Sequence, residues 1–287
     1  MRIVYKSKEP NLLVNQKGFS TISMIIKNAN KYRDGKIVFD MKKTSKMDGN
    51  LAGVYSALQI NLLKRGNNLR ILPRKACGVD VNLQKDMFGY FSSWEHEMEK
   101  TFQSGATKVF AFDPHDYESF NEYLLFEAFR KDWKGKIPYH YKLEVKSLLR
   151  ELFRNASEHS NSNNPIIFCL AYDGEMLNAT VVDCGEGFLK VFSKVDDEII
   201  NEGMAISRAM GGVSVKDRGA ERSCSLLWVG EYCHENEGEL FVISGSTTVR
   251  YDTRGFHQTS QMPAPFRGSI INFSLKITLP QFLAEAA

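Results

Sequence analysis

The chain has 287 residues, of which 43% are hydrophobic and 25% are charged. This length and apolar content suffice for one large core or two modest ones, and we expect two domains. The formal net charge is only +3. Such a mild balance gives no reason to expect nucleic acid or a membrane surface as a partner.

The five cysteines contain no C-x-x-C pair, and their odd number leaves at least one unpaired. Buried free thiols in a reducing compartment explain them more simply than a redox or metal role. The apolar stretch at residues 22–26 is soon interrupted by Lys27, Lys31 and Arg33, so we expect no membrane span. We therefore expect a cytoplasmic protein.

The N-terminal third shows a strand, helix, strand pattern. Residues 36–41 have the β-branched and aromatic content of a buried strand, and residues 51–63 carry apolar side chains at helical spacing. Residues 68–73 return as a strand after a turn at Gly66. A unit of this length predicts parallel pairing of the two strands.

Residues 37–73 resemble the STAS fold of bacterial anti-sigma antagonists. In that family a strand leads through an Asp-Ser-Ser/Thr-Gly-like loop into a helix, and here Met47-Asp48-Gly49-Asn50 occupies the loop. The aspartate is present, whereas Gly49 replaces the serine that is phosphorylated in the family. The resemblance implies a STAS-like α/β module over residues 1–77 that serves as a docking or scaffold unit.

Residues 78–138 form an aromatic-rich connector. Stacking of single-stranded nucleic acid bases is one interpretation of so many aromatic rings. Packing in the core and between domains is the other, and we favour it because basic residues are not interleaved in a groove-like pattern. The helical spacing of residues 118–131 predicts a helix packed against the domain that follows.

A helix over residues 143–160 carries polar side chains every four residues. Glu151, Asn155 and His159 lie along one line beside an apolar stripe. Taken alone, a solvated helix face explains this line well. A bound metal-phosphate group would explain it too, because polar groups beside a core need polar partners.

Two further strands, at residues 165–172 and 177–182, lead into Asp183-Cys184-Gly185-Glu186-Gly187. Alternate glycines suit a place where the backbone passes very close to a flat ligand. The carboxylate of Asp183 is able to accept a hydrogen bond from an exocyclic amine such as that of adenine.

Together, the Glu151-x-x-x-Asn155 helix and the Asp183-x-Gly185-x-Gly187 strand end resemble the N box and G1 box of the GHKL superfamily. The resemblance covers about residues 141–280, and it implies a two-layer α/β sandwich over residues 139–287, a histidine kinase-like ATPase domain. The chain as a whole is then an α/β (α+β) protein of two modules and a connector.

The family implies a role for each matching residue. Asn155 would coordinate Mg²⁺ that bridges the ATP phosphates, and Glu151 would orient and deprotonate the attacking water or hydroxyl. Asp183 would bind the adenine amine, and His159 would support the loop. The residues that would let the loop approach the base are Gly185 and Gly187.

The family continues with a glycine-rich lid whose amides cradle the phosphates. Here residues 218–227 occupy that place, and only Gly219 remains as glycine. The lid residues that would still offer amides or charge are Lys216, Arg218, Gly219, Arg222, Ser223 and Ser225, although a solvated basic loop explains the three cations equally well. In the last hairpin, Ser269 matches the hydroxyl residue at the adenine pocket, and residues 252–266 are expected to form a surface loop.

These resemblances predict an ATP-binding regulatory protein of bacterial type with ATP and Mg²⁺ as cofactors. A Mg-dependent ATPase switch is the first hypothesis, because Glu151 and Asn155 are both retained. An anti-sigma-type serine/threonine kinase and a non-catalytic nucleotide sensor or scaffold are the alternatives. We expect a protein partner, no membrane and no nucleic acid, and the oligomeric state is left open.

Overall fold

The computed structural model describes residues 2–6, 11–29, 31–40, 43–44, 46–48, 50–72, 109–129, 133, 135–211, 226–255 and 257–278. The helices are α1 (Gln16–Ala29), α2 (Leu51–Leu63), α4 (Tyr117–Phe126), α5 (Tyr139–His159), α6 (Phe188–Phe192), α7 (Glu202–Met210) and α8 (Leu226–Glu235). The strands are β1 (Arg2–Lys6), β2 (Asn11–Leu12), β3 (Lys36–Asp40), β4 (Lys46–Met47), β5 (Asn68–Leu72), β6 (Phe110–Phe112), β7 (Ile166–Tyr172), β8 (Met176–Asp183), β9 (Leu240–Tyr251) and β10 (His257–Lys276). The expected mixed α/β class is confirmed.

The N-terminal part is built on a small parallel sheet with the strand order β1-β3-β5. Its central register aligns Ile3, Ile37 and Leu69. The predicted parallel pairing of residues 36–41 with residues 68–73 is therefore confirmed. Helix α1, which we did not predict, has its apolar side chains on one buried face.

Helix α2 is buried around almost its whole circumference because it lies between two sheets. One side faces the parallel sheet, where Tyr55 stacks on Phe39. The other side faces β7 and β8, and a Cβ at Gly53 would lie 3.4 Å from Cys169 Cβ. A small side chain fits at this position, whereas a large one would push the helix away from the second sheet.

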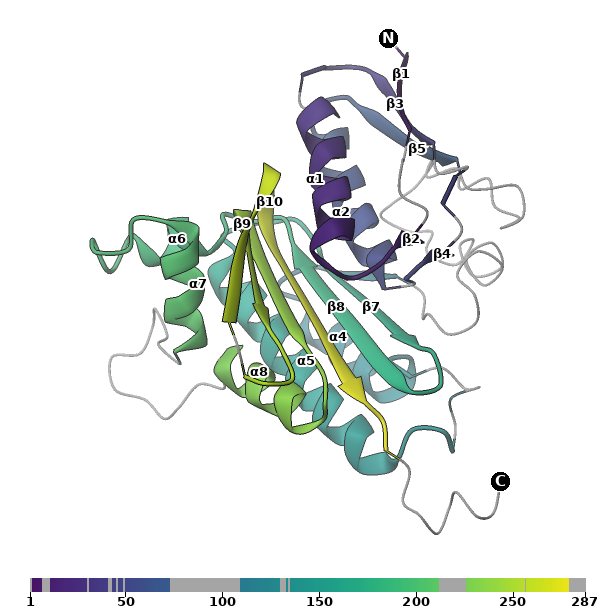
Figure 1. Cartoon of the computed structure of the whole chain (residues 1–287), viewed down its shortest axis with the longest axis vertical. Helices are drawn as coiled ribbons and strands as arrows, with labels where there is room; N and C mark the ends of the chain where they lie inside the picture. The colour runs from purple at the N-terminus through teal and green to yellow at the C-terminus, as the bar shows by residue number, and fades with distance from the viewer. Residues whose placement is uncertain are drawn as a thin grey trace.

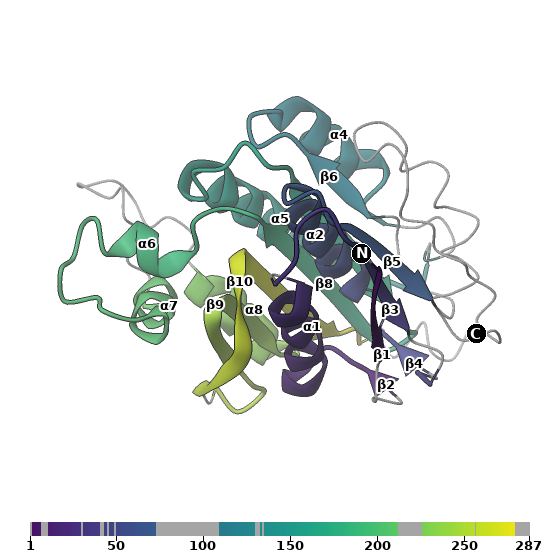
Figure 2. The same cartoon turned by 90° about the horizontal axis from the view of Figure 1, so that it is seen from above.

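The second sheet is antiparallel, with the strand order β6-β7-β8-β10-β9, and helices cover both of its faces (Figures 1 and 2). Alternate residues of each strand point to opposite faces. In β8, Val181 packs toward α5, whereas Val182 packs toward α1 and α2. A sheet covered on both faces explains the nearly continuous apolar runs of β7 and β8.

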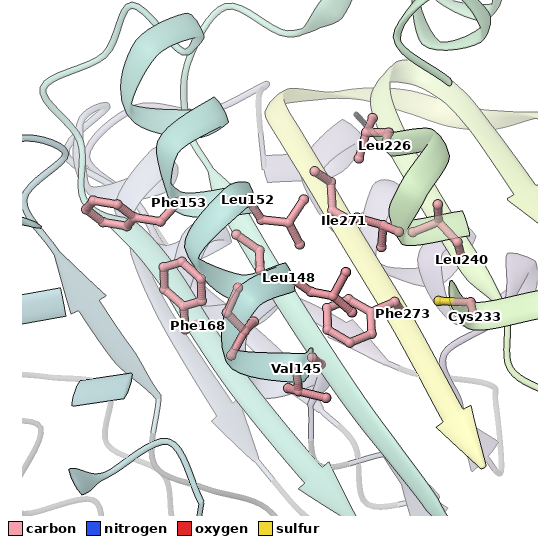
Figure 3. Packing of buried hydrophobic residues seen from close by; sticks show 14 of the residues in the cluster. Val145, Leu148, Leu152, Phe153, Phe168, Leu226, Cys233, Leu240, Ile271 and Phe273 are labelled. Atoms are coloured by element: carbon pink, nitrogen blue, oxygen red, sulfur yellow. The ribbon is translucent and has the colours of Figure 1, made fainter. Parts of the chain in front are cut away.

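The larger core lies between this sheet and helices α4, α5, α7 and α8. Figure 3 shows Leu148 and Leu152 of α5 above Phe273 and Ile271 of β10, next to Leu226 of α8. These side chains are between 0% and 7% exposed. The apolar stripe of α5 therefore holds that helix against the sheet.

Part of the segment that we described as a connector belongs to this sheet and core. Strand β6 pairs with β7, with Phe110 opposite Phe168. Helix α4 buries Phe120, whose ring stacks on Phe153 of α5 at a centroid distance of 4.1 Å. Within the described residues most aromatic side chains of this segment pack in the core, whereas Phe126 is exposed. Residues 78–108 lie outside the described part.

The expected surface loop at residues 252–266 is wrong. The turn after β9 is short, and β10 begins at His257 and pairs with β9 from Tyr251 onward. Pro263 and Pro265 fall where the register of β10 against β9 shifts, and both are exposed. A proline is tolerated there because the irregularity removes the need for its N–H in the ladder.

Within the described residues, no helix is long and apolar enough to cross a membrane. Three of the cysteines, Cys169, Cys184 and Cys233, are buried free thiols, as predicted.

Candidate functional site

Asp183 is the last residue of β8, and its side chain lies at the carboxyl end of that strand. It alternates with Val182 and therefore points to the same face as Val181, the face that α5 covers. The residue is 7% exposed. Its Oδ1 accepts a hydrogen bond of 2.8 Å from the Gly185 N–H, and its Oδ2 accepts one from the Ser269 hydroxyl.

Burial raises the pKa of Asp183 above its ordinary value, and the hydrogen bonds from Ser269 and Gly185 oppose the rise. An aspartate in an apolar setting is costly to ionise, and hydrogen-bond donors reduce that cost. The hydrogen bonds from Gly185 and Ser269 fix the orientation of the carboxylate. Ser269, predicted to belong to this site, pairs with Asp183 across the β8–β10 ladder.

Glycines around Asp183 are required by close contacts within the protein. A Cβ on Gly185 would lie 2.1 Å from the carbonyl oxygen of Ser160, at the end of α5. Gly187 has φ +81°, and Gly268 has φ +96° with Asp183 O only 2.1 Å from any added Cβ. Their own neighbours therefore account for these glycines, and an approach to a flat ligand stays a prediction.

Sequence reasoning missed two residues that hold the loop after Asp183. The Ser244 hydroxyl of β9 accepts a 2.9 Å hydrogen bond from the Phe188 N–H. Glu202, at the start of α7, accepts one of 3.2 Å from the Leu189 N–H. Gly245 has φ +54°, and a Cβ there would lie 2.8 Å from the Glu202 carboxylate. An isolated glycine inside a strand pattern was the available signal.

The polar line on α5 has its own arrangement. Glu151 is 7% exposed and forms a 2.7 Å ion pair with Arg154. Burial raises the pKa of Glu151, while Arg154 and a hydrogen bond from Asn155 counteract the rise. Asn155 and His159 are half-buried.

The end of α5 joins this line to the loop after β8. The Glu186 N–H donates a 2.9 Å hydrogen bond to Ser160 O, and Asn164 Nδ2 donates one of 3.0 Å to Cys184 O. Glu151 lies nine positions before Ser160, which corresponds to about 13 Å along a helix. Asn155 falls between them, so the acid and the amide are displaced along α5 from the Asp183 end.

The described structure gathers Asp183, Gly185, Gly187 and Ser269 at the end of β8. It places Glu151, Asn155 and His159 along α5, with Glu151 and Asn155 displaced from that end. The predicted lid residues lie outside the described part, namely Lys216, Arg218, Gly219, Arg222, Ser223 and Ser225. Among the residues that are described, no group of three or more His, Cys, Asp or Glu is placed to hold a metal ion.

Comparison with known proteins found no matching family model, no matching curated protein and no matching solved structure.

Proposed function

We propose that the chain is a nucleotide-binding regulatory protein of the GHKL type that binds Mg-ATP at the end of β8. The observation that carries this proposal is the fixed carboxylate of Asp183, held by Gly185 and Ser269 on the face covered by α5. An oriented acceptor suits the exocyclic amine of adenine. The length of α5 between Ser160 and Glu151 suits the distance from the base to the terminal phosphate of an extended ATP.

Asn155 fits a role as a ligand of Mg²⁺. Its half-buried side chain lies one helical turn after Glu151, and its amide oxygen is the kind of ligand that a hard cation takes. Mg²⁺ takes few protein ligands and completes its shell with waters and phosphates. A single amide oxygen next to a carboxylate therefore suffices, and the ion would neutralise phosphate charge at this place.

The state of Glu151 decides between hydrolysis and binding alone. Both of its carboxylate oxygens lie within 2.9 Å of Arg154 Nη2. The ion pair occupies both oxygens and opposes the rise that burial causes in the pKa of Glu151, so Glu151 is a weaker base than burial alone would make it. This contact favours the second candidate, a nucleotide sensor that holds ATP without rapid turnover, unless ATP draws Arg154 away. A protein kinase would need the same base for its substrate hydroxyl.

The N-terminal unit completes the proposal as a STAS-like scaffold. Asp48, the aspartate of the predicted loop, accepts a 2.8 Å hydrogen bond from the Val14 N–H through Oδ2. Its carboxylate therefore holds the segment before α1 in place. Gly49 itself lies outside the described residues.

Nucleotide binding by titration calorimetry, with and without Mg²⁺, tests the proposal. Asp183→Asn should weaken ATP binding at least about tenfold, equivalent to about 1.4 kcal/mol, because a donor amide then faces the adenine amine. Asp197→Asn, an exposed position, is the matched control and should bind as the wild type does. A folded Asp183→Asn protein with wild-type affinity, or a wild type that binds no ATP, would refute the proposal.

Phosphate release over several hours separates the two candidates. If the protein is an ATPase, the wild type releases phosphate and Glu151→Gln binds ATP but releases none. If it is a sensor, ATP is recovered intact from both proteins. Phosphate release by Glu151→Gln at the wild-type rate would exclude Glu151 as the base.

A further inference from the structure

Helices α4 and α5 lie on the side of the antiparallel sheet opposite to α1 and α2 (Figures 1 and 2). Both helices carry exposed apolar side chains. Leu125 and Phe126, at the end of α4, are 63% and 74% exposed. Tyr139 and Leu143, in the first turns of α5, are 74% and 46% exposed. A group of large apolar side chains left in water is typical of an interaction surface.

Three contacts bring these residues onto one surface by holding the two helices antiparallel. The Tyr117 hydroxyl lies 3.0 Å from Ser157 Oγ, and Arg150 Nε donates to Asn121 Oδ1 at 3.4 Å. Lys146 Nζ donates to Leu125 O at 3.4 Å. The end of α4 therefore lies beside the first half of α5, and we call this surface the α4–α5 face.

The charges of the α4–α5 face are divided by helix. The acidic residues of α4 and its C-cap are Glu118, Glu122 and Glu127, and the basic residues on this side of α5 are Lys142, Lys146 and Arg150. Within the described part of the chain, none of these six forms an ion pair. Burial lowers the pKa of Lys146, and the neighbouring Lys142 and Arg150 lower it further. The cations are thus close enough to repel one another without a compensating anion.

The division of charge indicates the kind of partner. A nucleic acid or an anionic membrane would meet the three carboxylates of α4 as well as the cations, and like charges at close range are unfavourable. A second copy of this chain, related by a twofold axis, would set the acidic α4 of each copy against the basic α5 of the other. An isologous interface requires a surface that is complementary to itself in this way.

We propose that the α4–α5 face is a homodimer interface, in which the apolar residues of two copies pack together and the two helices exchange charges. Because α5 also carries Glu151 and Asn155 at its other half, such a dimer would place two copies of the candidate site on one helical layer. The proposal does not depend on what that site binds.

Sedimentation of the full chain over a range of concentrations is the first test. The wild type should be a dimer that dissociates on dilution. Phe126→Asp should weaken self-association at least about tenfold, since a central apolar anchor is lost. Ile200→Asp is the matched control, because Ile200 is 75% exposed and lies outside this face. A monomeric wild type, or equal loss in both variants, would overturn the proposal.

A charge exchange gives the second test. One variant carries Lys at all three acidic positions of α4 and its C-cap, and the other carries Glu at the three basic positions of α5. Each variant alone should be monomeric, because its face then bears a single sign of charge. Mixed in equal amounts they should form a heterodimer, which damage to the fold of either chain could not produce. Two folded variants that stay monomeric when mixed would contradict the proposal.

Discussion

At the residue scale, the protonation of Asp183 makes the free energy of unfolding depend on pH. Its pKa is raised above 3.8 by burial, so the folded protein holds this proton more tightly than the unfolded chain. The resulting stabilisation is present below pH 3.8 and is lost as the pH rises through the folded pKa. An asparagine at this position has no such proton.

We therefore predict that the stability difference between Asp183→Asn and the wild type changes with pH. From pH 4 upward, the wild type should lose free energy of unfolding relative to the variant. Urea denaturation of both proteins at a series of pH values measures this difference and cancels the groups that they share. A difference that stays constant across the series would show that Asp183 has no raised pKa.

Arg154 is the residue whose removal should most change Glu151. Without its partner, the pKa of Glu151 should rise further, because burial then acts with less opposition. We expect Arg154→Ala to cost about 1–3 kcal/mol of unfolding free energy, the penalty for a largely buried group without its partner. Lys194→Ala, which removes an exposed ion pair with Glu186, should cost less than about 1 kcal/mol. Equal costs would mean that the burial of Glu151 has no energetic consequence.

Individual site residues were predictable from the sequence to differing degrees. Asp183 and Ser269 were expected at one site, and they are in contact. The motif after β8 carried the expectation for Asp183, and the resemblance of the last hairpin carried the one for Ser269. The ion pair of Glu151 with Arg154 was not foreseen, although positions i and i+3 are neighbours on any helix. The burial of Glu151 could not be foreseen, because it depends on the orientation of α5 in the tertiary structure. The support of the loop by Glu202 depends on the path of α7, which sequence spacing does not reveal.

At the element scale, the position of α2 between two sheets makes Gly53 a test of close packing. An added Cβ there would meet its nearest neighbour at 3.4 Å, an ordinary contact. Gly53→Ala should therefore be neutral or should stabilise by up to about 1 kcal/mol through helix propensity. Gly53→Leu should destabilise by about 1–3 kcal/mol, since the larger side chain pushes α2 away from β7 and β8. Thermal unfolding of both variants measures this, and tolerance of leucine would argue against the close approach.

A buried polar contact fixes the position of α2 on the sheet. Thr180 Oγ1 in β8 accepts hydrogen bonds from Asn50 Nδ2 at 3.1 Å and from Asn272 Nδ2 at 2.7 Å. Thr180→Val keeps the shape but leaves two buried donors without an acceptor. We expect a loss of about 2–4 kcal/mol in unfolding free energy.

The same substitution at Thr248 is the matched control for this prediction. Thr248 is equally buried at 1% exposed, and within the described structure its hydroxyl has no hydrogen-bond partner. Thr248→Val should therefore be neutral or stabilising. If the two substitutions changed stability equally, the contact among Asn50, Thr180 and Asn272 would contribute nothing.

Most elements were predictable from their apolar period, whereas α1 and the first half of β10 were missed. The sequence did carry a signal for α1, because Phe19, Ile22, Ile26 and Ala29 recur at helical spacing. Ser23 is held by a residue that is more than two hundred positions away in the sequence. Its hydroxyl donates a hydrogen bond to Ala264 O and accepts one from the Ala264 N–H. The prolines of β10 favoured a loop because nothing local in the sequence shows the change of register that accommodates them.

At the scale of the whole molecule, the antiparallel sheet is shared by two cores. One side of each strand contributes to the core with α5 and α8, and the other side contributes to the core with α1 and α2. Ile243 and Ile270 of the second sheet pack in the same cluster as Leu58 of α2. The N-terminal unit is therefore a layer of the fold, and removing it would expose an apolar sheet face.

This sharing predicts that the chain unfolds in one cooperative transition. Leu58→Ala in the N-terminal unit and Leu148→Ala in α5 each remove a side chain that is at most 1% exposed. Each should cost about 2–5 kcal/mol. Each should also shift the circular dichroism transition and the fluorescence transition of the buried Trp133 together, although Leu58 and Trp133 lie in different cores. Trp94 and Trp228 are replaced by phenylalanine in these proteins, so that the fluorescence comes from Trp133 alone. Independent units would behave differently, because Leu58→Ala would then leave the Trp133 transition in place. Coincident shifts would mean that any ligand bound near Asp183, such as the proposed nucleotide, also stabilises the N-terminal layer, since ligand binding raises the stability of the whole cooperative unit.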